Sequence, residues 1–518
     1  MKTYQTLLLI DIESMKFLSP AISRLARLRS LKMDHFIYSP CATQEEVFLD
    51  LINHGQETEF GKKYRFDRIF GVESFKEHVP LQDYEDLKPY IDRIIAGEEN
   101  LLWDSPIRWF AKSSGTTSDK SKFIPVTQDS LDDCHYRAGR DVLTLYYNNY
   151  PKSDLLTGKS LVIGGSHQVN QLNELISYGD LSAVILQNMP FYGHLMRTPD
   201  LEVALMGEWE QKIDRIARDT INENVSSIAG VPSWTIVLLK YILKLTGKSD
   251  LREVWPNLEL YLHGGVSFTP YETQFNKFIK GSGMHYQETY NASEGFFAAQ
   301  DNLKENKGMM LLLQHGIFYE FMPLEEYGKE QPKTLQLNEV EIGKSYAMVI
   351  TTNGGLWRYL LGDTIQFTTT YPFRIEITGR VKSFINAFGE EVVVENADKA
   401  IAAACKKTGA IINDYTVAPI FFSDQDNGAH EWLIEFDKVP DSIASFTQFL
   451  DHKLQSINSD YESKRYKDIA LRMPEIKMLP VGTFSKWLDY KDKLGGQHKV
   501  PRLCNNRKYV EEILEIIK

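Results

Sequence analysis

The 518-residue chain is poor in cysteine, has no basic surplus and contains no long apolar run. Its four cysteines, Cys41, Cys134, Cys405 and Cys504, are widely spaced and form no Cys-x-x-Cys pair. This spacing argues against zinc ribbons and disulfide scaffolds, and favours a reducing, cytoplasmic location. The 70 acidic residues outnumber the 58 basic ones, so nucleic acid is not an expected partner. No stretch approaches the ~18 apolar residues of a membrane span, so no membrane association is expected.

Several familiar catalytic motifs are also missing. Two Thr-Gly-Lys-Ser strings, at 157–160 and 246–249, lack the first glycine of a P-loop, and we expect both to be turns at helix ends. The string at 164–168, Gly-Gly-Ser-His-Gln, is one glycine short of the nucleophile elbow of hydrolases. The twelve histidines show no His-Glu-x-x-His spacing. The sequence therefore predicts neither a covalent nucleophile nor a tightly held transition metal.

The apolar pattern predicts an α/β fold. Helical patterns alternate with short β-rich runs, namely TEFGKKYRF, SLVIGGS, SAVILQNMP, VSSIAGVP and NLELYLHGG. Such alternation is typical of parallel sheets, which bind ligands at the carboxyl ends of their strands. From about Leu311 the pattern changes to strands joined by turns, and a mixed segment runs from about 383 to 518. The boundary at 379–382 is a candidate hinge.

The stretch Ser-Ser-Gly-Thr-Thr, residues 113–117, is the first candidate binding element. Backbone N–H groups and hydroxyls in such a turn can surround phosphate oxygens, and Gly115 permits close approach. Lys120 and Lys122 add positive charge, and the strand-like Phe-Ile-Pro-Val-Thr that follows would fix the base of the loop. An ordinary solvated turn remains the alternative.

Three further segments support a nucleotide site. Glu294, in YNASEGFFAA, can hold Mg2+ on nucleotide phosphates, although an exposed loop glutamate is the alternative. Asp363, in LWRYLLGDTIQF, can accept both ribose hydroxyls, although Gly-Asp is also common in β-turns. Arg380 and Lys382, in TGRVKSFINAFGEEV, enter an apolar strand that is followed by a glycine turn.

Together and in this order, the segments resemble the adenylate-forming superfamily. Within it they are most similar to the plant auxin-responsive acyl acid amido synthetases, the GH3 family, and their bacterial relatives. The matching sequence motifs are SSGTT, K.K.IP, Y.ASEG.F, LWRY..GD, GR.K.FIN..GEEV and the C-terminal segment PVGTFSKWLDYKDKLGGQHKVPRL, called the tail below. The tail is the most specific part, and the resemblance covers roughly residues 15 to 505. The compact length favours a bacterial member.

The resemblance implies two domains in an α/β protein. A large N-terminal adenylate-forming domain with mixed sheets and helices, residues 1–381, would bind ATP and the acyl acid. A small, mobile α+β C-terminal lid domain, residues 382–518, would close over it, with the hinge near Arg380 and Lys382.

The resemblance also implies roles for individual residues. The phosphate-binding residues would be Ser113, Ser114, Gly115, Thr116, Thr117 and Lys122, and the adenine would contact Tyr290, Ala292 and Ser293. Glu294 would bind Mg2+ and Asp363 would bind the ribose, with Arg380 near the ribose at the hinge. Lys382 would mark the pivot between the domains. Lys499 would be the mobile lysine that stabilises the adenylation transition state.

The activity implied is an ATP-dependent ligation in two steps. A small carboxylic acid attacks the α-phosphate of ATP to give an acyl adenylate and pyrophosphate, and an amino acid amine then takes the acyl group. The first step needs cations and preorganised donors rather than a protein nucleophile, which agrees with the missing nucleophile motifs. A hinged lid would shield the adenylate from water.

The acyl pocket is predicted less specifically. Leu181, Val231, Pro232 and Trp234 fall on loops and helix starts at the expected ligand edge, where apolar side chains suit a small acid. Plain core packing is the alternative for each of them. His263 and His167 follow strands and can orient the acid or act on the amine, although such histidines are more often core residues.

Two alternative functions are compatible with the same residues. An acid:CoA ligase would use the same adenylation chemistry with a thiol acceptor, and a non-catalytic acid-binding protein could keep the same fold. The tail favours the amide-forming family. Three residues depart from the family pattern. Ser118 stands where glycine is common, and Leu360 and Leu361 replace Arg-Val before Gly-Asp. The oligomeric state is not predicted.

Overall fold

The computed structural model describes most of the chain. The described residues are 19–113, 122–164, 169–265, 268, 271–305, 307–381, 384–385, 387, 390, 392–421, 428–458, 461–462, 465, 471–491, 499–504 and 506–518. Among these residues, no helix combines the length and apolar character that crossing a membrane requires.

One large mixed sheet organises the N-terminal part. Its eleven strands, in spatial order, are β12 (Ile317–Pro323), β13 (Ser345–Thr352), β14 (Tyr359–Thr370), β15 (Phe373–Arg380), β11 (Met309–Leu311), β10 (Gly295–Ala299), β9 (His285–Ala292), β8 (Leu260–Gly264), β7 (Val225–Ala229), β3 (Lys159–Val162) and β6 (Arg197–Thr198). The pairs from β6 to β9 are parallel, and those from β9 to β12 are antiparallel. The predicted change of pattern near Leu311 therefore follows the change from parallel to antiparallel pairing.

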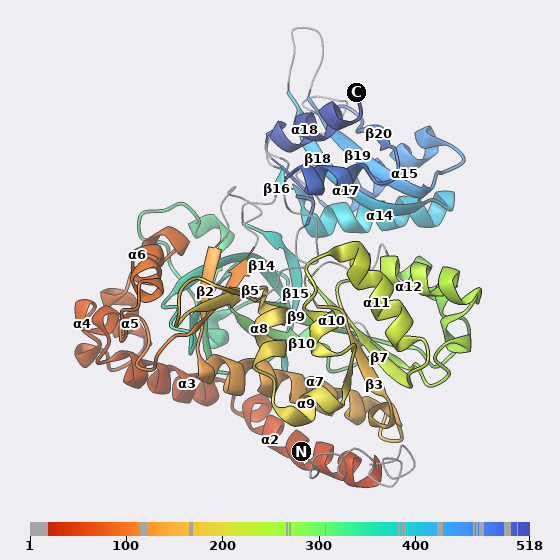
Figure 1. Ribbon diagram of the computed structural model, residues 1–518. Helices are drawn as coiled ribbons and strands as arrows, with labels where there is room; N and C mark the ends of the chain where they lie inside the picture. The colour runs from red at the N-terminus through yellow and green to blue at the C-terminus, as the bar shows by residue number, and fades with distance from the viewer. Residues whose placement is uncertain are drawn as a thin grey trace, which may run out of the picture.

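Helices cover both faces of the sheet (Figure 1). They are α2 (Ser19–Tyr38), α3 (Pro40–Gly55), α4 (Glu59–Lys63), α5 (Val72–His78), α6 (Tyr84–Ile95), α7 (Arg137–Asn149), α8 (Leu181–Gln187), α9 (Phe191–Leu195), α10 (Leu201–Ala204), α11 (Trp209–Thr220), α12 (Pro232–Thr246) and α13 (Glu272–Phe278). α12 begins with Pro232, whose missing N–H suits a first helical position, and ends at Gly247, which adopts the left-handed conformation. The second Thr-Gly-Lys-Ser string is thus a helix end, as predicted.

Two predicted strands are wrong. The run SAVILQNMP lies mostly in α8, and TEFGKKYRF lies mostly in α4. Periodicity cannot separate a short apolar run in a helix from one in a strand. In α4 the hydroxyl of Thr58 accepts a hydrogen bond from the Gly61 backbone N–H at 3.0 Å, so local capping starts a helix there.

A small sheet lies beside the large one. Its strands are β2 (Lys122–Val126), β1 (Trp109–Ser113), β5 (Ser177–Gly179) and β4 (Asn170–Gln171). β1 and β2 are antiparallel, with Ser113 paired to Lys122. The strand predicted after the hydroxyl-rich stretch is confirmed as β2.

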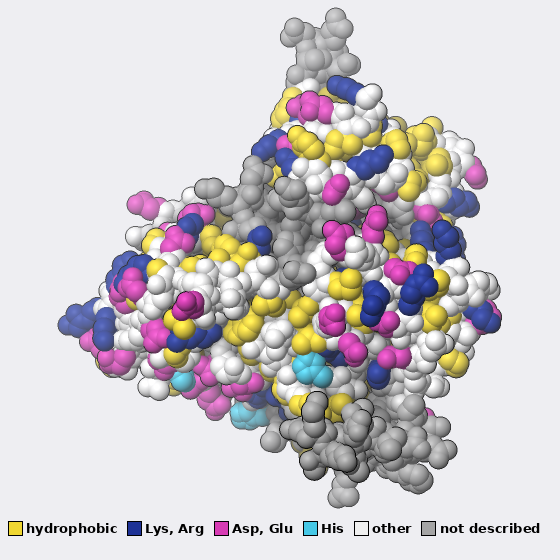
Figure 2. All heavy atoms as spheres, viewed as in Figure 1, with side chains coloured by type: hydrophobic (Ala, Val, Ile, Leu, Met, Phe, Trp, Pro, Cys, Tyr) yellow, Lys and Arg dark blue, Asp and Glu magenta, His cyan; other side chains and the backbone are white. Residues whose placement is uncertain are grey.

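The C-terminal part has its own sheet and core. β18 (Ile411–Ile420), β19 (Ala429–Lys438) and β20 (Glu475–Leu479) form one sheet, and β16 (Phe384–Ile385) pairs with β17 (Val392–Val393). The helices are α14 (Val394–Thr408), α15 (Ile443–Ile457), α17 (Thr483–Tyr490) and α18 (Lys508–Ile516). Figure 1 shows α14 on the side of this part that faces the N-terminal part. Over the described surface in Figure 2, acidic and basic side chains are interspersed.

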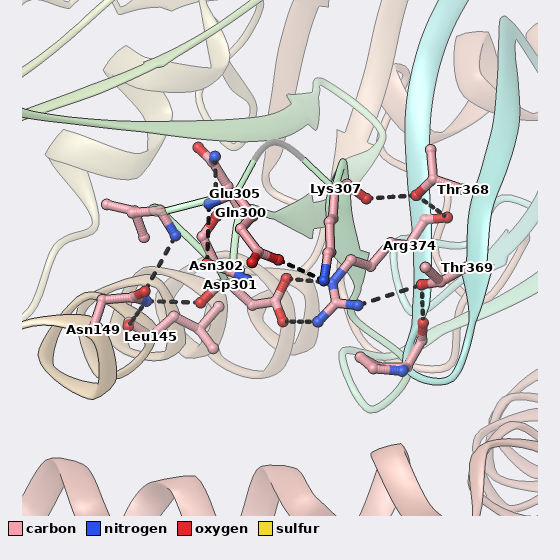
Figure 3. Close-up of polar contacts among 12 residues, drawn as sticks. Leu145, Asn149, Gln300, Asp301, Asn302, Glu305, Lys307, Thr368, Thr369 and Arg374 are labelled. Atoms are coloured by element: carbon pink, nitrogen blue, oxygen red, sulfur yellow. Dashed lines mark hydrogen bonds and ion pairs between the residues drawn. The ribbon is translucent and has the colours of Figure 1, made fainter.

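A polar network joins α7 to strands β10 and β15 of the large sheet (Figure 3). Arg374 of β15 donates two hydrogen bonds to Asp301, at 2.8 and 2.7 Å, just after β10 ends. The side-chain amide of Asn149, at the end of α7, donates to the Asp301 carbonyl at 2.7 Å. These contacts hold the strands that carry the candidate site in a fixed relation.

Arg358 is a second buried anchor. It is 4% exposed and has a φ of 42°, an uncommon conformation for a residue with a side chain. Its guanidinium donates to both carboxylate oxygens of Glu320, at 3.0 and 2.9 Å, and to the Val79 carbonyl at 2.6 Å. The arginine of the LWRY segment therefore joins β14 to β12 and to the end of α5.

We expect Arg358→Ala to lower the free energy of unfolding by about 3–5 kcal/mol, because it leaves the buried Glu320 carboxylate without a countercharge. Differential scanning calorimetry would show this as a lower transition temperature. The control is Lys329→Ala, which removes an exposed bridge to Glu326 and should leave the transition unchanged. Equal effects of the two substitutions would contradict the buried-anchor interpretation.

Candidate active site

The β1–β2 hairpin bounds the first element of the site. Ser113 ends β1, whereas Ser114, Gly115, Thr116 and Thr117 lie outside the described residues, as do Ser118 and Lys120. Lys122 lies between two aromatic rings. Its Nζ is 5.4 Å from the ring centre of Tyr84, and it donates to the Tyr359 hydroxyl at 3.4 Å. The lysine predicted to add charge at this loop is thus fixed against β14.

Asp363 is the centre of a buried polar cluster. Its carboxylate accepts a hydrogen bond from the Tyr290 hydroxyl at 2.7 Å and pairs with Arg380 Nε at 2.8 Å. Asp363 and Arg380 are also register partners on β14 and β15. Gly362, just before Asp363, has a φ of 88°, a conformation that favours glycine. The structure therefore brings together three residues that are predicted from three separate segments.

The carboxylate of Asp363 keeps capacity for a ligand. An ionised carboxylate has about four acceptor sites, and the two contacts to Tyr290 and Arg380 use half of them. The Arg380 side chain is 45% exposed, so the cluster is open on one side. The geometry is compatible with the predicted contact to a pair of hydroxyl groups.

Glu294 lies in the turn between β9 and β10, next to Ser293 and two residues after Ala292, where β9 ends. Burial raises the pKa of the Glu294 carboxyl, while the charge of Lys122 lowers it. The side chain is nevertheless only half-buried. Glu294 is therefore partly accessible and within electrostatic range of Lys122, Arg380 and Asp363.

Lys499 enters the same region from the C-terminal part. Its ammonium group donates a hydrogen bond to the carbonyl of Gly265, one residue after β8 ends. A Cβ built on Gly265 would lie 3.4 Å from Lys499 Nζ and 3.5 Å from Val231 Cγ2, so both side chains border this glycine. Burial, with a smaller contribution from Arg380, lowers the pKa of Lys499 to about 8.

The predicted acyl-pocket residues have different environments. Val231 is half-buried before α12 and Pro232 is buried, whereas the side chain of Trp234 lies outside the description. Leu181 is 4% exposed and packs in the main core. His263 is 5% exposed and stacks on Phe268 with ring centres 4.4 Å apart. His167 and Lys382 lie outside the described residues.

His263 and Glu288 are neighbours across the parallel β8–β9 pair, where they are register partners. Burial lowers the pKa of His263 to about 3, and its Nδ1 has no hydrogen-bond partner among the described residues. Burial also raises the pKa of Glu288 to about 7, although its side chain is half-buried. Glu288 was not predicted. Its position two residues before Tyr290 puts both side chains on one face of the strand, which the alternation could have shown.

Comparison with known proteins identifies the family. The GH3 family N-terminal domain matches residues 29–284, the central domain matches 310–380 and the C-terminal domain matches 395–508. The chain belongs to the GH3 family. The resemblance drawn from the ordered motifs is therefore confirmed.

Curated GH3 relatives match along nearly their whole length. The chain is 24% identical over 543 residues to an indole-3-acetic acid-amido synthetase of Arabidopsis thaliana, covering 91% of this chain and 90% of that one. It is 23% identical over 545 residues to a 4-substituted benzoates-glutamate ligase of the same plant, covering 90% and 93%.

Solved structures confirm the predicted fold class. The chain matches a GH3.15 acyl acid amido synthetase in complex with 2,4-DB with a TM-score of 0.79 at 19% identity, over 96% of both chains. A 2-hydroxyisobutyryl-CoA ligase matches with a TM-score of 0.58 at 13% identity, over 91% of both chains. At these identities the likeness concerns the fold alone.

The position of Lys499 predicts its titration. We expect competitive acetylation of the native GH3 protein, read by mass spectrometry, to give Lys499 a midpoint near pH 8. Arg380→Gln should move that midpoint to higher pH, because it removes a nearby positive charge that disfavours the ammonium form. An unchanged midpoint in the variant would show that Arg380 does not act on Lys499.

Proposed function

We propose that this GH3 protein is an ATP-dependent acyl acid amido synthetase. It adenylates a small carboxylic acid and transfers the acyl group to the amine of an amino acid. The observation that carries the proposal is the approach of Lys499, from the C-terminal part, to the edge of the sheet beside Asp363, Tyr290 and Arg380. The names of the curated relatives, an acid-amido synthetase and a benzoate-glutamate ligase, support it.

In the first step, a carboxylate oxygen of the acid attacks the α-phosphorus of ATP. The bond from that phosphorus to the bridging oxygen breaks, and pyrophosphate leaves. Negative charge grows on the phosphoryl oxygens, where the ammonium of Lys499 and the guanidinium of Arg380 stabilise it. Asp363 accepts hydrogen bonds from the ribose hydroxyls. The adenine side is lined by Tyr290, Ala292 and Ser293. Residues 113–117, together with Lys122, hold the phosphates.

The carboxylate of Glu294 is a suitable ligand for Mg2+. Mg2+ commonly takes one or two carboxylates together with substrate phosphates, rather than a cage made only of protein ligands. Accordingly, the described residues contain no group of three or more His, Cys, Asp or Glu able to hold a metal. Burial, with a smaller contribution from the charge of Asp363, raises the pKa of Glu294, and a divalent cation would favour its ionised form. When bound, the cation would supply charge neutralisation at the phosphates.

In the second step, the amine attacks the acyl carbonyl carbon, AMP leaves with the bonding electrons, and the nitrogen loses its proton. Residues 382–518 act as the lid that excludes water from the adenylate, with residues 1–381 as the ATP- and acid-binding domain and Lys382 at the pivot. The acyl side of the site is formed by Val231, Pro232, Trp234 and His263 at the sheet edge, together with Leu181.

The decisive experiment is pyrophosphate release with ATP and Mg2+ across benzoate, a 4-substituted benzoate, indole-3-acetate and short aliphatic acids. Each acid is tested alone, with CoA, and with mixed amino acids. We expect amino acids to raise turnover and to give an amide by mass spectrometry. Stimulation by CoA alone would instead identify an acid:CoA ligase. ATP binding without turnover on any acid would favour a non-catalytic acid-binding protein.

Lys499→Ala is expected to lower the rate of pyrophosphate release by about 10²–10³-fold, the usual cost of removing one group that stabilises transition-state charge. Stopped-flow detection of pyrophosphate measures this rate. The binding constant for ATP, from calorimetry, should change far less. An unchanged release rate would remove Lys499 from the mechanism.

The adenylation rate should also fall as pH rises through about 8, because Lys499 loses its proton in that range. The matched control is Lys499→Arg, whose guanidinium stays charged, so its pH profile should lack this alkaline fall even if its rate is lower. The same alkaline midpoint in the arginine variant would assign the titration to another group.

A further inference from the structure

The segment that carries Lys499 is fixed to the C-terminal sheet. Three residues after Lys499, the carbonyl of Arg502 accepts a hydrogen bond from the Val417 backbone N–H at 2.9 Å. The Cys504 backbone N–H donates to the Val417 carbonyl at 3.0 Å, and the Thr416 hydroxyl donates to the Pro501 carbonyl at 2.5 Å. Residues 499–504 thus lie along the edge of β18, and the placement of the C-terminal part decides where Lys499 lies.

The side chain of Arg502 has contacts in both parts of the molecule. Within the C-terminal part it pairs with the Asp414 carboxylate, donates to the Tyr415 carbonyl at 3.1 Å and stacks 4.4 Å from the Tyr415 ring centre. Its other terminal nitrogen donates to the hydroxyl of Tyr271, in the N-terminal part, at 3.2 Å. Tyr271 is 3% exposed, so this contact is shielded from water.

Tyr271 lies immediately before α13, between the end of β8 and the start of β9. One helical turn later on the same side, the Gln274 side-chain amide donates to the Ile412 carbonyl at 3.2 Å. Gly265, which receives the Lys499 ammonium, is six residues before Tyr271 in the same connection. The segment between β8 and β9 therefore contacts the C-terminal part through Gly265, Tyr271 and Gln274.

We propose that Tyr271 is a positioning residue for adenylation, and that its hydroxyl, acting through Arg502, holds Lys499 at Gly265. The chemistry of the pair suits a contact that must also open. The countercharge of Arg502, Asp414, belongs to the same part of the molecule, so separation of the two parts leaves no buried charge unpaired. At this contact, separation breaks a single hydrogen bond to a neutral phenol.

This role rests on the proposed function, and it applies to the first half-reaction only. Pyrophosphate release without an acceptor measures adenylation. Amide formation from chemically prepared benzoyl adenylate and indole-3-acetyl adenylate measures transfer. Tyr271→Phe removes the hydroxyl and keeps the ring. We expect the rate of adenylation to fall about tenfold or more, as for loss of a hydrogen bond to a charged group, while the rate of transfer changes less than about twofold.

Two controls separate this contact from general effects. Tyr286→Phe removes another tyrosine hydroxyl near α13, one that donates to Asn276 within the N-terminal part. Lys240→Ala removes a different bridge between the two parts, to Asp437 at 3.1 Å. Both variants should keep both rates near those of the unmodified protein. An equal loss of both rates in Tyr271→Phe, or no loss in either, would overturn the proposal.

A second measurement does not depend on activity. Competitive acetylation reports whether the Lys499 ammonium still lies at Gly265, the position in which its pKa is lowered to about 8. Tyr271→Phe should move its midpoint above pH 8, because a lysine released from Gly265 regains water, whereas both controls should not. If the unmodified protein releases no pyrophosphate with any acid, the proposed function fails, and the midpoint alone decides whether Tyr271 holds Lys499. An unchanged midpoint in Tyr271→Phe would overturn the contact itself.

Discussion

The buried carboxylate of Asp363 joins parts of the chain that are far apart in sequence. It accepts from Tyr290 on β9 and pairs with Arg380 at the end of β15, while Asp363 itself lies on β14. A carboxylate that is 7% exposed requires such partners, because an unpaired buried charge is costly. The pairing therefore fixes the relative positions of the strands that carry the candidate nucleotide site.

The charged groups around Asp363 share an unusual environment. Glu294 and Lys499 keep accessible surface although the surrounding protein shifts the pKa of each toward its neutral form. Where the surrounding protein desolvates such groups, their interactions with an incoming charge are stronger than in open water. A cluster that contains both cationic groups and a carboxylate suits a polyphosphate with its cation, which supports the proposed adenylation.

Much of this arrangement could be predicted from the sequence, because the relevant signals are local. The strand after the hydroxyl-rich stretch, the glycine before Asp363 and the change of strand pattern near Leu311 are each properties of a few consecutive residues. Local signals failed in SAVILQNMP, where a short apolar run forms a helix. Arg358, in the LWRY segment, is a structural anchor whose partner Glu320 lies on another strand, so no local pattern shows the pair.

The sequence by itself determined the family, the α/β class and the segments that supply the candidate site, since ordered motifs and periodicity are written along the chain. Only the tertiary structure decided which side chains meet. Glu288 becomes a neighbour of His263 through strand register, and Tyr271 meets Arg502 across 231 positions in the sequence. Contacts of this kind depend on how separate elements pack, and packing is a property of the whole fold that no local pattern encodes.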